Sequence, residues 1–364
     1  MRYSQWDESA AKVRPNKRGS RPRTKERPSY EDAEIGRVIT VDRGRYTAIL
    51  DEDTPQERIV IAARARELRR QAVVPGDRVA LVGDTSGTPD TLARLVRVEE
   101  RSTVLRRSAD DTDATARVVV ANVDVLVIVV AAANPQPRTG FVDRALVAAY
   151  DAGIQPVLCV TKADVCDPAP FLAHYEGLNL PVVISRTTSA EASGVDARGA
   201  DGSSARLDAA ALDSLHELLA GRVSVVLGHS GVGKSTLVNA LTGADRATGH
   251  VNAVTGRGRH TSSNALALKL GGTPGSWLID TPGIRSFGLG LVDPDNILQA
   301  FEDLAEVAVQ CPRGCTHLAS APGCALSDWV TTEQAPANAA SRLESYRRLV
   351  TTEETTNEKE LGAL

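Results

Sequence analysis

The residues best suited to chemistry are the eight at positions 228–235, which read GHSGVGKS. They match the phosphate-binding pattern in which glycines let the backbone approach a polyphosphate, so that its N–H groups point at the oxygens. In this pattern the Lys234 ammonium reaches the β- and γ-phosphates, and the Ser235 hydroxyl takes a magnesium position. An apolar run at residues 223–227 predicts a strand before the loop, and residues 236–241 predict a helix after it. Strand, loop and helix together are the context that phosphate binding requires.

A second strand end is expected at the motif Asp280-Thr281-Pro282-Gly283, which follows another apolar run. The Asp280 carboxylate can hold magnesium there, usually through water, and the Gly283 N–H can face the γ-phosphate. In many GTPases a glutamine follows this motif and orients the attacking water. Ile284 stands at that position and cannot orient water. The pattern therefore indicates either another catalytic group or a slow intrinsic rate.

Residues 256–261 read GRGRHT and lie between these two motifs, where a magnesium-sensing switch loop belongs. Thr261, or Ser262 next to it, offers a second hydroxyl to magnesium. His260 is the candidate for orienting the attacking water. We therefore predict His260 and Lys234 as the catalytic residues.

The tetrapeptide Thr161-Lys162-Ala163-Asp164 ends a third apolar run and indicates guanine recognition. In the [N/T]-K-x-D pattern the Asp carboxylate pairs with the guanine N1–H and exocyclic amine, while the Lys stem lies along the base. Adenine presents the opposite donor pattern, so Asp164 selects GTP over ATP by leaving buried groups unpaired when the wrong base enters. Ser185, at the end of the next apolar run, resembles the residue that closes over the base. Arg186 follows it where a small residue is usual.

The order of these motifs is unusual, because TKAD precedes GHSGVGKS. Ordinary GTPases run phosphate loop, switch, DxxG and then [N/T]KxD. The same sheet can be built if the chain is cut after DTPG and the old termini are joined, since sheet neighbours set the site. The sequence therefore predicts a circularly permuted P-loop GTPase domain.

Near the C-terminus, three of the five cysteines gather around a histidine, as Cys311, Cys315, His317 and Cys324. Three thiolates and one imidazole complete a closed tetrahedral set, which is typical of structural zinc. An odd cysteine count also favours metal binding over disulfides in a reducing compartment. We predict one structural Zn²⁺ that holds a small domain with little apolar core.

The chain of 364 residues exceeds a typical single domain. Hydrophobic residues at 42% and charged residues at 24% fit a globular protein. No apolar run approaches the roughly 20 residues that span a bilayer, and the first residues carry no apolar signal segment. We therefore expect a cytoplasmic protein that makes no membrane contact.

Four regions position the motifs, with expected bounds of 1–33, 34–100, 101–290 and 291–364. The first is a basic arm with eight Lys or Arg between residues 12 and 27, which we expect to be disordered and to contact nucleic acid. The second holds short apolar runs separated by Gly and Pro, which predict an oligonucleotide-binding (OB) type β-barrel with an RNA-binding face. The third is α/β, and residues 186–206 within it are expected to form a flexible loop. The fourth is the mostly helical zinc-binding domain.

The motifs TKAD, GHSGVGKS, GRGRHT and DTPG, with VDRGRY in the barrel and the Cys/His cluster, stand in the order of a known family. The chain resembles the circularly permuted ribosome-assembly GTPases of the RsgA/YjeQ type from about Glu34 onward. The resemblance implies a bacterial protein that acts on the maturing small ribosomal subunit and hydrolyses GTP when the subunit stimulates it. It also favours the loop histidine, His260, as the water-orienting residue. The chain departs from the family at the Cys-x3-Cys spacing, at Ser185-Arg186 and in the insertion that follows.

We therefore expect a GTP hydrolase that acts late in small-subunit maturation as a monomer and binds GTP or GDP, Mg²⁺ and ribosomal RNA. One alternative is a passive RNA-binding assembly factor that senses GTP without useful turnover, which Ile284 favours. Another is an ATP-dependent kinase or transporter subunit, which Asp164 opposes. Magnesium is assigned to Ser235, Thr261 and Asp280. The residues expected to bind GTP are Thr161, Lys162, Asp164, Ser185, Gly228, His229, Ser230, Gly231, Val232, Gly233, Lys234, Ser235, Thr236, Asp280 and Gly283.

Overall fold

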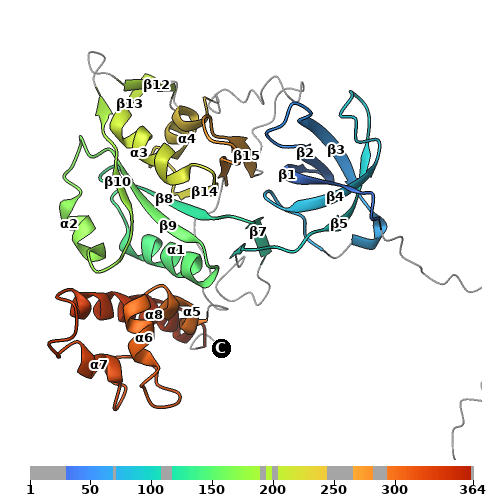
Figure 1. Ribbon diagram of the computed structural model, residues 1–364. Coiled ribbons are helices and arrows are strands. Elements are labelled where there is room, and N and C mark those ends of the chain that lie inside the picture. The colour runs from blue at the N-terminus through green and yellow to red at the C-terminus, as the bar shows by residue number, and fades with distance from the viewer. Residues whose placement is uncertain are drawn as a thin grey trace, which may run out of the picture. The chain divides into compact units, whose positions relative to one another are not determined.

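A computed structural model describes residues 30–68, 71–107, 117–188, 194–198, 204–243, 265–281 and 293–361 (Figure 1). The predicted basic arm lies outside these ranges up to residue 29. The described helices include none that is both long and apolar enough to cross a membrane.

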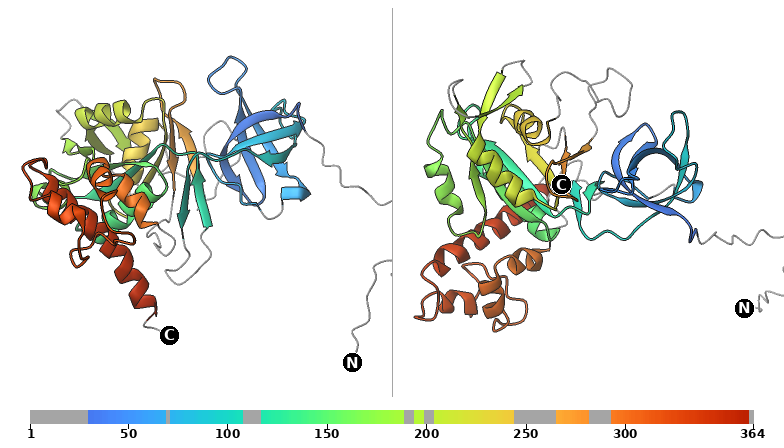
Figure 2. Two further views of the ribbon diagram at one scale, coloured as in Figure 1. Left: turned by 60° about the horizontal axis from the view of Figure 1, so that its bottom comes forward. Right: turned by 45° about the horizontal axis from the view of Figure 1, so that its top comes forward.

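The N-terminal part is a five-stranded β-barrel, visible in Figure 2. Strand β1 pairs with both β2 and β4, β2 pairs with β3, and β5 closes the circle between β3 and β4. Alternate residues of the strands point inward, so Val38, Val60, Val79 and Leu95 are at most 1% exposed. This confirms the predicted barrel. Its elements are β1 (Glu34–Asp42), β2 (Arg45–Leu50), β3 (Arg58–Arg64), the 3₁₀ turn η2 (Arg66–Leu68), β4 (Arg78–Gly83) and β5 (Ala93–Val98).

A second part is a mostly parallel sheet in the order β10-β9-β8-β14-β16-β15. Only β15 runs antiparallel to its neighbour β16 within this part. Strand β8 is buried throughout and reads as a continuous apolar run, as expected for a parallel strand covered on both faces. The strands are β8 (Val125–Ala131), β9 (Gln155–Thr161), β10 (Val182–Ile184), β14 (Val223–Gly228), β15 (Leu266–Lys269) and β16 (Trp277–Asp280).

Helices cover both faces of this sheet (Figure 1). Along β8 the side chains alternate between two cores. Leu126 and Ile128 belong to the core that includes α1, whereas Val127 and Val129 belong to the core that includes α3 and α4. The covering elements are α1 (Thr139–Asp151), α2 (Ala169–Leu172), the 3₁₀ turn η3 (Ala173–Tyr175), α3 (Ala209–Leu219) and α4 (Lys234–Thr242).

Two smaller sheets complete this part. One pairs β6 (Val104–Arg107) with β7 (Arg117–Ala121). The other joins β11 (Thr187–Thr188), β12 (Gly194–Arg198) and β13 (Ser204–Asp208) in the region predicted as a flexible loop. That prediction is wrong for these three strands, because antiparallel pairing satisfies the backbone of small residues without the apolar alternation that signals a strand.

The C-terminal part is helical, as predicted, and its helices share one core with α1. The Phe301 and Tyr346 rings lie 5.8 Å apart in an edge-on arrangement within this core. Asp293 caps the first helix through the backbone N–H of Asp295. The helices are α5 (Pro294–Gln299), α6 (Glu302–Ala308), α7 (Ala325–Trp329) and α8 (Ala339–Leu361).

The barrel and the parallel sheet form one 11-stranded sheet, because β1 pairs with β15 at Thr40 and Leu266. The predicted order of a barrel, an α/β part and a helical C-terminal part is therefore confirmed. The residue numbers given to the domain boundaries stay predictions.

Candidate functional site

The phosphate-loop sequence follows β14 directly and ends at α4. Gly231 and Gly233 have φ angles of 84° and 88°, a left-handed conformation that side chains disfavour. At Gly228 a Cβ would lie 2.8 Å from the Val129 carbonyl oxygen, so a side chain there would collide with β8. Helix α4 begins at Lys234, and its unpaired N-terminal N–H groups form a positive helix end at the loop. This geometry suits a polyphosphate.

Asp280 ends β16, the strand next to β14, and lies opposite Val226 in the register. Its carboxylate is almost fully buried and forms an ion pair with the Lys234 ammonium. Thr281 is also buried, and its Oγ1 donates to the Val226 carbonyl at 3.0 Å. The structure thus brings the predicted magnesium carboxylate and the predicted phosphate lysine together. Ser235 and Thr236 lie partly buried in the first turn of α4.

The guanine motif ends β9 and contacts the phosphate loop directly. Thr161 Oγ1 donates to the Val232 carbonyl at 2.6 Å. The Lys162 ammonium donates to the Gly231 carbonyl at 2.7 Å and also to the Asn134 carbonyl. Two motifs 71 residues apart in the chain therefore meet at the carboxyl ends of β9 and β14, parallel strands on either side of β8. The carboxyl ends of the strands are where α/β sheets bind ligands.

Asp164 and Ser185 lie on adjoining loops. The Thr187 backbone N–H donates to Asp164 Oδ1 at 2.8 Å, and the Ala163 N–H donates to the Ser185 carbonyl at 3.2 Å. Sequence reasoning missed Thr187 because a backbone donor has no side-chain signature. It also missed Asn134, although the Asn134-Pro135 dipeptide is a turn signal.

The remaining phosphate-loop residues face a small cavity beside α1. The His229 ring lies 4.3 Å from the Phe141 ring, centroid to centroid. A mostly apolar cavity of about 300 Å³ is lined by His229, Ser230, Phe141 and residues 135–138, among others. His229 thus packs against α1, which sequence spacing alone did not show.

Four of the predicted residues of the nucleotide site lie outside the described residues. They are His260, Thr261 and its alternative Ser262, and Gly283. Ile284 lies outside them as well. Their assignments stay predictions.

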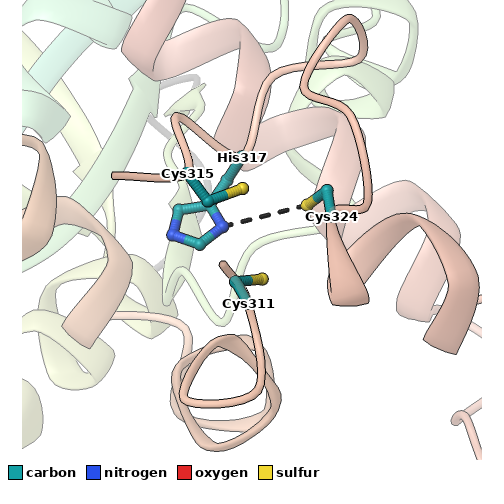
Figure 3. Close-up of side chains that lie close together, drawn as sticks. All are labelled: Cys311, Cys315, His317 and Cys324. Carbon is teal, nitrogen blue, oxygen red and sulfur yellow. Dashed lines mark hydrogen bonds between the residues drawn. The ribbon is translucent and has the colours of Figure 1, made fainter. Parts of the chain in front are cut away.

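The predicted metal ligands Cys311, Cys315, His317 and Cys324 converge on one point (Figure 3), with all four ligand atoms within 4.8 Å of one another. Cys324 Sγ lies 3.8 Å from His317 Nδ1. Burial opposes ionisation of Cys324, but hydrogen bonds from His317 and from backbone N–H groups outweigh it and lower the pKa of the thiol to about 6. Burial raises the pKa of Cys315. A thiolate beside an imidazole fits Zn²⁺, which prefers soft sulfur and nitrogen donors.

Helix α8 supports this cluster from outside. The Arg347 guanidinium donates to the His317 carbonyl at 2.9 Å and to the Ser327 hydroxyl at 2.6 Å. His317 has a φ angle of 58°, so its backbone adopts a left-handed conformation that needs such support. These contacts orient the ligand loop, as outer residues around metal sites commonly do.

Comparisons with known proteins agree with this geometry. A sequence model of the RsgA GTPase family matches residues 98–290. A protein from Pseudomonas aeruginosa (strain LESB58) named small ribosomal subunit biogenesis GTPase RsgA is 39% identical over 257 residues, which cover 70% of this chain and 69% of that protein. The crystal structure of YjeQ from Thermotoga maritima has a TM-score of 0.56 at 23% identity, covering 88% of this chain and 98% of that one. The structure of YloQ, a circularly permuted GTPase, has a TM-score of 0.58 at 22% identity, covering 90% and 97%.

Proposed function

The chain belongs to the family of RsgA GTPases, and we propose that it hydrolyses GTP to GDP and phosphate while it is bound to the maturing small ribosomal subunit. The contact between the guanine motif and the phosphate loop, from Thr161 Oγ1 to the Val232 carbonyl, is the observation that carries this proposal. It brings the predicted guanine motif into direct contact with the predicted phosphate loop, which supports one nucleotide site built from both.

The phosphates would lie along the loop that ends at α4. The backbone N–H groups of this loop and the N-terminus of α4 would hold the phosphate oxygens, and Lys234 would exchange its ion pair with Asp280 for the β- and γ-phosphates. Positive charge fixed at these positions stabilises the charge that develops in the transition state.

Magnesium fits this end of the site because the donors are hard oxygens. The Asp280 carboxylate and the Ser235 hydroxyl would hold it, with Thr261 as the predicted further ligand. When bound, magnesium offsets the negative charge of the β- and γ-phosphate oxygens. His260 would orient the attacking water, because Ile284 cannot.

Zinc is the metal that best fits the Cys311, Cys315, His317 and Cys324 cluster, and its role would be structural. The four donors lie within 4.8 Å of one another and would supply the four ligands of a tetrahedral zinc site. The ligands lie between α6 and α7, helices of 7 and 5 residues, so a metal would contribute to the folding energy of this segment.

The partners proposed here are the small subunit and its ribosomal RNA. The barrel, the basic arm and the helical part would contact RNA, and the protein would act as a cytoplasmic monomer. Sequence similarity to a small ribosomal subunit biogenesis GTPase supports the subunit as partner.

The test is the rate of GTP hydrolysis alone, with purified small subunits and with purified large subunits. We expect stimulation by small subunits only, and a loss of that stimulated rate in Lys234→Ala. Normal GTP binding with no stimulation would favour the passive assembly factor instead, the alternative that Ile284 supports.

Base selection is tested in the same assay with Asp164→Asn, which replaces one carboxylate oxygen, an acceptor, with an NH2 group, a donor. We expect the variant to prefer xanthosine triphosphate, because xanthine offers an oxygen where guanine has its exocyclic amine. Tighter binding of ATP than GTP by the unaltered protein would refute the guanine assignment.

A further inference from the structure

An arginine follows the base-closing serine in this chain. Ser185 is buried, whereas the next residue, Arg186, is exposed. Arg186 carries a long cationic side chain, and its neighbour Thr187 holds Asp164 through its backbone N–H. Nothing in the proposed hydrolysis accounts for it.

The backbone around Arg186 is fixed on both sides. The Ser185 N–H donates to the Val160 carbonyl at 2.8 Å, and the Asp208 N–H donates to the Arg186 carbonyl at 3.1 Å. The following residue, Thr187, pairs with Leu207 in the sheet and holds Asp164 through its N–H. The Arg186 backbone is therefore held by hydrogen bonds on both sides, next to the loop that carries Asp164, the carboxylate predicted to select guanine.

The Arg186 side chain is free to bind a ligand. Two Lys or Arg residues lie in the described stretch 161–188. One of them, Lys162, is engaged by carbonyl oxygens of the phosphate loop and of Asn134. The Arg186 guanidinium forms no hydrogen bond or ion pair in the described part of the chain, although the Asp164 carboxylate lies on the adjoining loop.

The chemistry of guanine indicates what this guanidinium recognises. When Asp164 takes the N1–H and the exocyclic amine, the next group along the base edge is O6, and N7 lies beyond it. Both are acceptors, and arginine binds them together through two parallel N–H groups, which is the commonest specific contact to guanine in protein–DNA complexes. Adenine carries an amine in place of O6, which an arginine cannot pair with.

We propose that Arg186 donates to O6 and N7 of the bound guanine and so adds to the selection of guanine nucleotides. The inference rests on the proposed GTP site. It assigns the acceptor edge of the base to Arg186, while the donor edge stays with Asp164.

The test compares three diphosphates in equilibrium binding to the full chain: GDP, 7-deaza-GDP, which lacks the N7 acceptor, and IDP, which lacks the exocyclic amine. The unaltered protein should bind 7-deaza-GDP about fivefold more weakly than GDP, since the lost contact is charge-assisted but exposed. Arg186→Ala should bind GDP and 7-deaza-GDP with equal affinity, and it should bind GDP more weakly than the unaltered protein does. Arg186→Lys should retain little of the discrimination, because an ammonium cannot span both acceptors.

Matched controls separate this role from general effects. Arg66→Ala removes the same charge from an exposed side chain of the barrel and should leave all three affinities unchanged. The penalty for IDP, which reports on Asp164, should persist in Arg186→Ala. Its persistence, with an unchanged melting temperature, shows that the rest of the guanine site is intact.

Three results would overturn the proposal. The first is an Arg186→Ala variant that retains the full preference for GDP over 7-deaza-GDP. The second is an Arg186→Ala variant that loses only cosedimentation with small subunits, which would make Arg186 an RNA contact. The third is an unaltered protein that binds no guanine nucleotide; the proposed function then fails together with the inference, and the absence of GDP binding identifies that case.

Discussion

Arg342 links C-terminal helices to each other and to the rest of the protein. Replacing it should show how much this link contributes to the free energy of unfolding. The guanidinium of Arg342 makes two parallel hydrogen bonds to Asp303, of 2.9 and 2.7 Å. It also lies over the Phe301 ring at 5.4 Å and donates to the Gly177 carbonyl at 3.4 Å. One side chain therefore links α8 to α6 and to the loop after η3.

The expected cost follows from burial. The Arg342 side chain is 6% exposed and that of Asp303 is 25% exposed. Breaking a fully buried ion pair costs about 3–5 kcal/mol, and an exposed pair about 0–1 kcal/mol. For this intermediate pair we expect Arg342→Met to lower the free energy of unfolding by about 2–3 kcal/mol, because methionine keeps part of the packing volume but leaves Asp303 unpaired.

The assay is denaturant unfolding followed by fluorescence, with Arg97→Met as the matched control. Arg97 pairs with Glu99 at 2.8 Å, but the two side chains are 45% and 31% exposed, so its loss should cost under about 1 kcal/mol. Equal losses in the two variants would refute the argument from burial.

The same pair predicts a dependence on pH. Burial of the Asp303 carboxyl opposes ionisation, but the Arg342 hydrogen bonds outweigh it and hold its pKa below the ordinary value of 3.8. A lowered folded-state pKa contributes stability above the unfolded value and loses it as the pH falls through the folded value. The unaltered protein should therefore exceed Arg342→Met in unfolding free energy by the full amount at neutral pH, and this difference should shrink below about pH 4. A difference that is constant down to pH 3 would contradict the pairing.

Three further predictions concern the metal, the nucleotide site and the barrel junction. Cys324→Ser should lower the zinc content, measured by mass spectrometry, from about one per chain to near zero, with a lower melting temperature. Thr161→Val should weaken GDP binding about fivefold by removing the hydrogen bond to a phosphate-loop carbonyl, whereas Thr281→Val, which removes a similar bond to β14, should mainly lower stability. Gly76→Ala should cost more than about 3 kcal/mol in unfolding free energy, because its Cβ would lie 2.0 Å from a carbonyl oxygen at the end of β7.

Local patterns were enough to predict the elements that carry the chemistry. Three motifs, TKAD, GHSGVGKS and DTPG, begin at the last residue of a buried strand, and the change from a continuous apolar run to Gly, Asp or Lys marks that point in the sequence. The Cys/His cluster could also be predicted, because three cysteines and one histidine lie within a short stretch of sequence and these residue types are the usual zinc ligands. In the described residues the three motifs contact one another at the carboxyl ends of the parallel strands.

Contacts between distant segments could not be predicted in this way. Asp53, on the barrel loop after β2, binds the Lys269 ammonium at 2.8 Å and the Gly275 N–H at 2.7 Å across more than 200 residues. Glu52 on the same loop accepts from the Trp277 indole N–H. In the sequence these are ordinary loop acids before a barrel strand, so only the folded arrangement reveals that they attach the barrel to the β15–β16 hairpin.

The circular permutation gives these attachments a functional arrangement. The barrel binds Lys269 and Trp277, which lie on the hairpin whose second strand ends in Asp280, the predicted magnesium carboxylate. The C-terminal helix α8 instead packs on α1, and its Arg348 donates to the His174 carbonyl at 2.7 Å, between β9 and β10. In the ordinary motif order the chain would continue from the DxxG strand to the guanine motif. Here it continues to the C-terminal helices, so the two flanking modules contact different parts of the predicted nucleotide site. The barrel contacts the hairpin that ends in the predicted magnesium carboxylate, and α8 contacts the segment that follows the predicted guanine motif.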